Sequence, residues 1–78
     1  MNRQEAILLL KEIMAVCESF YYTQAVDIER NKKSGSWALI VYWLPGPSEI
    51  EQLEKIVAQH NLEMVSSIGR IIFRSPEN

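Results

Sequence analysis

The segment that decides the fold is residues 37–44, which read Trp-Ala-Leu-Ile-Val-Tyr-Trp-Leu. Its aromatic and β-branched side chains favour an extended strand. Successive side chains of a strand point to opposite faces, so this strand is apolar on both sides. Residues 45–47, Pro-Gly-Pro, end it. A strand of this kind needs cover on both of its faces.

A second strand precedes this segment and is joined to it by a polar loop. In residues 22–29, apolar Tyr22, Val26 and Ile28 are separated by polar side chains, which predicts a strand with one solvated face. Residues 31–35, Asn-Lys-Lys-Ser-Gly, are polar and contain a glycine, as hairpin loops do. The two strands therefore form a predicted β-hairpin.

The N-terminal segment predicts a helix from about residue 3 to 18. Asn2 and Glu5 have the spacing of a capping box, which satisfies free N–H groups at a helix start. Apolar side chains then recur every three or four residues, as on the buried stripe of a helix. These are Ala6, Leu9, Leu10, Ile13, Cys17 and Phe20.

A second helix is predicted from about residue 49 to 60. Ser48 and Glu51 repeat the capping-box spacing, and apolar side chains follow at helical intervals. Asn61 is a suitable helix stop, because asparagine tolerates the left-handed conformation that often ends helices.

The C-terminal part predicts two short strands, residues 62–67 and 70–74, joined at Ile68-Gly69. One continuous strand with a glycine bulge is the alternative. The element order is therefore α-β-β-α-β-β, or α-β-β-α-β with one long last strand. Either order predicts one α+β domain spanning residues 1–78. The expected fold is a two-layer sandwich with both helices on one face of a three- or four-stranded antiparallel sheet.

The register of the hairpins predicts which side chains lie on the other, uncovered face. A first hairpin symmetric about Lys33 pairs Val26 with Ile40 and directs both toward the helices. A tight turn at Ile68-Gly69 pairs Glu63 with Arg74 and Met64 with Phe73. The uncovered face then carries a predicted interaction surface, with Arg70 and Glu63 near its rim. Its other members are Trp37, Leu39, Val41, Trp43 and Ile72.

A shift of one residue in the first hairpin exchanges the two faces of its strands. Both tryptophans then enter the core, whereas Ile40, Tyr42 and Leu44 face outward. An apolar surplus remains on the uncovered face in either register, and such patches usually mark interaction surfaces.

No motif in the chain predicts an enzyme, a metal site or a cofactor site. His60 is the only histidine, and no spacing places a nucleophile or an orienting carboxylate beside it. Cys17 is the only cysteine and lies on the apolar stripe of the first helix, where cysteine behaves as a small hydrophobe. No glycine-rich phosphate loop is present.

The expected function is protein interaction or regulation by a cytoplasmic domain that has no membrane contact. Nearly half of the residues are apolar, at 47%, so a chain this small has apolar surface to bury by pairing. The preferred partner is a second copy, as a homodimer, or otherwise another protein. The alternative is a small ligand or single-stranded nucleic acid on the same face, where tryptophans and arginines could stack bases. The net charge of −2 argues against general nucleic-acid binding.

Overall fold

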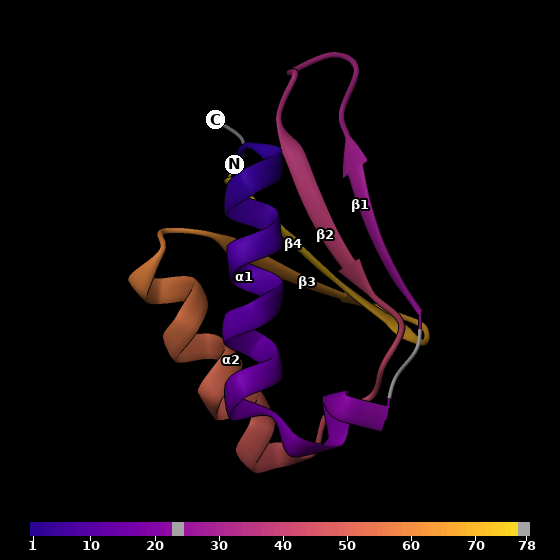
Figure 1. Cartoon of the computed structure of the whole chain (residues 1–78), viewed down its shortest axis with the longest axis vertical. Helices are drawn as coiled ribbons and strands as arrows, with labels where there is room; N and C mark the ends of the chain where they lie inside the picture. The colour runs from indigo at the N-terminus through magenta and orange to yellow at the C-terminus, as the bar shows by residue number, and fades with distance from the viewer. Residues whose placement is uncertain (23–24, 77–78) are drawn as a thin grey trace.

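The computed structural model describes residues 1–22 and 25–76 and has the α-β-β-α-β-β order expected from the sequence (Figure 1). Two α-helices, one short 3₁₀ turn and four strands make up this α+β fold. They are α1 (Arg3–Val16), η1 (Glu18–Tyr22), β1 (Val26–Arg30), β2 (Trp37–Val41), α2 (Pro47–Gln59), β3 (Glu63–Ser67) and β4 (Arg70–Arg74).

Helix α1 begins at the predicted capping box. The Asn2 side chain accepts a hydrogen bond from the Glu5 N–H, and the Glu5 carboxylate accepts one from the Asn2 N–H, both at 2.8 Å. The helix ends at Val16, because Cys17 has extended backbone angles. Of the strand predicted over residues 22–29, residue 22 belongs to the 3₁₀ turn and β1 starts at Val26, while residues 23 and 24 lie outside the described residues.

Helix α2 begins two residues earlier than expected, and the predicted Ser48–Glu51 capping box is wrong. Pro47 occupies the first turn, where its missing N–H leaves no hydrogen bond unmade. Glu49 takes the capping role, since its carboxylate accepts a 2.9 Å hydrogen bond from the Gly46 N–H. Asn61 has a φ of 53°, which confirms it as the helix stop.

The four strands form one antiparallel sheet in the order β1-β2-β4-β3. The second hairpin has the predicted register, with Glu63 opposite Arg74 and Met64 opposite Phe73. Gly69 has a φ of 72° in its turn, a conformation that glycine adopts without strain. Residues 63–74 therefore form two strands rather than one bulged strand.

The first hairpin has the other register, so the predicted pairing of Val26 with Ile40 is wrong. Val26 lies opposite Val41, and Arg30 lies opposite Trp37. The loop is one residue longer than predicted, because the Asn31 N–H donates to the carbonyl of Ser36 at 2.7 Å. This one-residue shift reverses the faces of β2, whereas Val26 and Ile28 of β1 still pack against the core on the helix side, as predicted.

Both helices lie on the same side of the sheet (Figure 1). One buried cluster joins side chains of α1 and α2 to alternate residues of the two central strands, β2 and β4. Its buried members are Leu9, Ile13, Cys17, Phe20, Leu39, Val41, Trp43, Leu53, Ile56, Ile71 and Phe73. The helices thus cover one face of the sheet and leave the opposite face without a helical layer.

Among the described residues, no helix is both long enough and apolar enough to cross a membrane.

Candidate functional site

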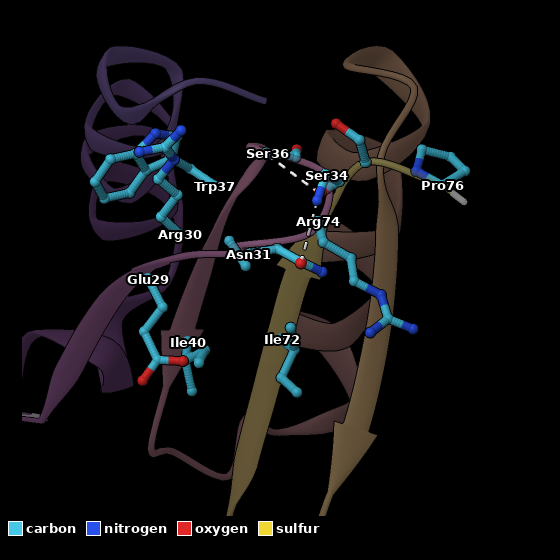
Figure 2. Close-up of a pocket in the computed structure, with 12 residues that line it drawn as sticks. Glu29, Arg30, Asn31, Ser34, Ser36, Trp37, Ile40, Ile72, Arg74 and Pro76 are labelled. Carbon is cyan, nitrogen blue, oxygen red and sulfur yellow. Dashed lines mark hydrogen bonds between the residues drawn. The ribbon is translucent and has the colours of Figure 1, made fainter. Parts of the chain in front are cut away.

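The sheet face opposite the helices, here called the open face, is the candidate site. Its side chains are those that alternate with the core residues along each strand. On β1 they are Asp27 and Glu29, and on β2 they are Ala38 and Ile40, followed by Tyr42 directly after the strand. On β4 they are Arg70, Ile72 and Arg74, and on β3 they are Glu63, Val65 and Ser67. Figure 2 shows part of this face around Ile40 and Ile72.

Three residues of the predicted interaction surface lie in the core instead. Leu39 and Val41 have no exposed surface, and Trp43 is 6% exposed. The Trp43 ring packs edge-on against Phe20 with 5.0 Å between ring centroids. Its indole N–H donates a 2.9 Å hydrogen bond to the Ser19 hydroxyl. The placement of these three side chains on the open face is therefore wrong.

Three other predicted residues do lie on the open face. Ile72 is half-buried between Ile40 of β2 and Val65 of β3 in the strand register. Glu63 accepts a 2.7 Å hydrogen bond from the Arg74 Nε. Arg70 is exposed at the other end of β4. The seventh predicted residue, Trp37, shares the strand parity of Leu39 and Val41, so its placement on the open face is also wrong. It is half-buried at the end of β2 and lines a groove described below.

An apolar row crosses the middle of the open face. Ile40, Ile72 and Val65 are cross-strand neighbours on β2, β4 and β3. Ile40 is only 5% exposed, whereas Ile72 and Val65 are half-buried. Tyr42 adds an aromatic ring that is 39% exposed. Ile40 and Tyr42 belong to the outward set of the shifted register, which the sequence left open as the alternative.

Charged side chains form columns along two strands: Arg70 and Arg74 flank Ile72 on β4, and Asp27 of β1 lies opposite Ile40. Asp27 and Glu29 make the acidic column on edge strand β1, and Arg70 and Arg74 make the basic column on β4. Strand β2, which lies between the two columns, carries no charged side chain on this face. The open face is thus acidic on β1 and basic on β4, where Arg74 pairs with Glu63 of edge strand β3.

Tyr42 links the two columns. Its hydroxyl donates a 2.8 Å hydrogen bond to the Asp27 carboxylate. This hydrogen bond is the main cause that raises the pKa of Tyr42, helped by partial desolvation and the negative charge of Asp27, while the Arg70 guanidinium opposes the shift. The phenol therefore stays protonated at neutral pH and acts as a donor.

A groove of about 610 Å³ lies at one end of the open face. Ile40 and Ile72 contribute apolar side chains to it, and the tip of the β1–β2 hairpin and the end of β4 form its sides (Figure 2). Its lining also includes Glu29, Arg30, Trp37 and Arg74. The groove combines an apolar floor with charged rims, as small-molecule sites do.

His60 and Cys17 have structural contacts outside the open face. The His60 Nε2 lies 2.7 Å from a Glu12 carboxylate oxygen and joins α2 to α1. Burial, followed by the charge of Glu49, raises the pKa of the Cys17 thiol, which disfavours the nucleophilic thiolate. Within residues 1–22 and 25–76, no group of three or more His, Cys, Asp or Glu side chains could hold a metal ion.

Neither a family model, a curated protein nor a solved structure matches this chain.

Proposed function

We propose that this domain is a protein-interaction module that self-associates through the open face of its sheet. The observation that carries the proposal is the apolar centre of a face that neither helix covers: Ile72 and Val65 are half-buried and Tyr42 is 39% exposed, beside the buried Ile40. Antiparallel sheets commonly leave one face to solvent, and on this face charged side chains surround an apolar centre. An uncovered apolar centre with a charged border has the composition of an interface core and its rim.

Self-association is tested by sedimentation over a concentration series with two matched variants. Ile72→Asp places a charge in the apolar row, whereas Ile68→Asp places it in the β3–β4 turn, where Ile68 is 101% exposed. We expect the wild-type chain to dimerise and Ile72→Asp to weaken the dimer by roughly tenfold or more. Ile68→Asp should leave it unchanged.

Circular dichroism must show that both variants are folded, because Ile72 is half-buried. A wild-type chain that stays monomeric at every concentration contradicts the proposal. Equal effects of the two substitutions also contradict it, because association would then not depend on the open face.

The groove favours a second function, the binding of a small molecule that has an apolar body and an anionic end. Trp37, Ile40 and Ile72 would contact the apolar body, and the Arg30 guanidinium at the rim would attract the anion. The groove volume of about 610 Å³ lies within the range of drug-sized ligand sites.

This second function is tested with anilinonaphthalene sulfonate, an apolar anion whose fluorescence rises on binding. We expect saturable binding by the folded wild-type chain that is weakened by Arg30→Glu. Lys32→Glu is the matched control, since Lys32 is exposed in the same hairpin loop but does not line the groove. Binding that responds equally to both substitutions would be nonspecific and would contradict a ligand site in the groove.

A further inference from the structure

Strand β1 is an open edge of the sheet. Among the described residues it pairs only with β2, and Figure 1 shows it as the outermost strand. An edge strand directs the N–H and C=O groups of every second residue away from the sheet, where another strand can bond them. Extended peptide segments bind proteins by adding a strand to an edge of this kind.

Two hydrogen bonds identify the residues of β1 whose backbone groups point outward. At one end of the strand the Tyr42 N–H donates to the Ala25 carbonyl at 3.2 Å, and at the other the Asn31 N–H donates to the Ser36 carbonyl at 2.7 Å. Bonding toward β2 therefore falls on the odd-numbered residues, since it alternates along an antiparallel strand. The residues that present their N–H and C=O groups at the edge are Val26, Ile28 and Arg30.

The side chains of β1 give this edge two different sides. Val26 and Ile28 are half-buried and pack against the core on the helix side. Asp27 and Glu29 are exposed on the open-face side, and neither forms an ion pair in the described part of the chain. The Asp27 carboxylate accepts a hydrogen bond from the neutral Tyr42 hydroxyl, which leaves its negative charge in place. The edge is therefore apolar on one side and acidic on the other.

An antiparallel second copy of β1 does not suit this edge. Two copies related by a two-fold axis must pair outward-bonding residues with one another. Every register that pairs at least two of these residues places Asp27 opposite Asp27, Asp27 opposite Glu29, or Glu29 opposite Glu29. Like charges directly opposite one another destabilise a strand pair. The acidic side chains thus protect the edge from self-pairing and favour a strand that carries positive charge.

We infer that β1 binds an extended segment of another protein in which basic and apolar side chains alternate. In an antiparallel addition, the apolar side chains lie beside Val26 and Ile28, and the basic ones lie beside Asp27 and Glu29. Backbone hydrogen bonds supply the affinity, and the alternation supplies the selectivity. The other edge strand, β3, carries only one charged side chain, Glu63, which is ion-paired within the sheet, so no charge pattern selects a partner there.

A labelled peptide of the inferred pattern tests this site. The probe is fluorescein-labelled Thr-Lys-Val-Lys-Val-Thr, titrated with the full chain and followed by fluorescence anisotropy. In antiparallel register its lysines lie beside Glu29 and Asp27, and its valines lie beside Ile28 and Val26. We expect saturable binding that weakens by roughly tenfold or more when glutamate replaces both lysines.

Methylation of the peptide backbone tests the strand addition itself. In the inferred register the N–H groups of the two valines point at β1, whereas those of the two lysines point away. N-methylation of both valines should abolish binding. N-methylation of both lysines is the matched control and should retain most of it. Equal binding of the two methylated peptides would show simple attraction of a cation and would overturn the inference.

A charge reversal in the chain tests the selectivity from the other side. Glu29→Lys changes an exposed side chain and should lower the affinity for the lysine peptide by about fivefold, while raising it for the glutamate peptide. Glu51→Lys makes the same charge change at an exposed position of α2 and should leave both affinities unchanged. Equal effects of the two substitutions would contradict a site at β1.

The outcomes separate this inference from the proposed self-association, because it uses the edge of the sheet rather than the open face. A chain that dimerises but does not bind the lysine peptide overturns the inference alone. A monomeric chain that binds the lysine peptide, and discriminates between the two methylated forms, supports the inference and contradicts the proposed function.

Discussion

At the scale of single residues, Glu49 is the side chain that ties the 3₁₀ turn to the start of α2. Its carboxylate accepts hydrogen bonds from the Ser19 hydroxyl at 2.6 and 2.7 Å and from the Gly46 N–H at 2.9 Å. The same hydroxyl accepts the hydrogen bond from the buried Trp43 indole. The Ser19 hydrogen bond, followed by that of Gly46, lowers the pKa of Glu49.

Because its pKa is lower in the folded chain, Glu49 stabilises the fold above its unfolded pKa and loses this effect as the pH falls through its folded pKa. We expect Glu49→Gln to lower the free energy of unfolding at neutral pH by about 1 kcal/mol, the usual effect of losing a helix cap. The difference from wild type should shrink toward acidic pH. Urea unfolding followed by circular dichroism over a pH series measures it.

Glu51→Gln is the matched control for this measurement, since Glu51 is exposed on the same helix. A Glu49→Gln deficit that is constant from neutral to acidic pH would show that the ionised carboxylate is not the stabilising species.

At the scale of elements, the sequence predicts those segments whose ends depend on local chemistry. The Asn2 capping box starts α1, and Gly69 supplies the positive φ that the tight second hairpin requires. The predicted start of α2 is wrong because two acidic residues, Glu49 and Glu51, both suit the first turn of a helix. Pro47 is the residue that distinguishes them, since proline is favoured at the first helical position.

The register of the first hairpin could not be predicted from hydrophobic pattern, because β2 is apolar on both faces. The loop decides it: the Asn31 side chain accepts from the Lys33 N–H at 2.9 Å, and Gly35 adopts a φ of 74°. Together they form a six-residue loop between Arg30 and Trp37. Asparagine followed by glycine four residues later is the signal in the sequence that indicates this longer loop.

At the scale of the whole molecule, three of the seven residues predicted for the interaction surface lie on the open face. Glu63, Arg70 and Ile72 lie on the open face as predicted, because the second hairpin's register follows from its tight turn. Which side chains of the second strand reach the open face depends on the register of the first hairpin. In the structure they are Ile40 and Tyr42 instead of the predicted Leu39 and Val41. The opposed charge columns appear only when the order β1-β2-β4-β3 is known.

The size of the open face limits how strong the dimer can be. Four strands of five residues, about 4.8 Å apart and rising about 3.3 Å per residue, outline roughly 300 Å². Stable complexes bury about 800 Å² on each partner, so we expect a weak dimer with a dissociation constant in the micromolar range or above. A face of this area favours reversible association that depends on the concentration of the chain.

The dimer should also weaken as salt is added, because oppositely charged side chains border the apolar centre of the open face. The Debye length falls from about 10 Å at 0.1 M salt to about 3 Å at 1 M, which screens the attraction between the acidic and basic columns. Sedimentation at several sodium chloride concentrations measures the dissociation constant, with Ile72→Asp as the reference for lost apolar contact. If apolar burial alone held the copies together, added salt would leave the dimer unchanged or strengthen it, and the charge columns would then serve solubility rather than association.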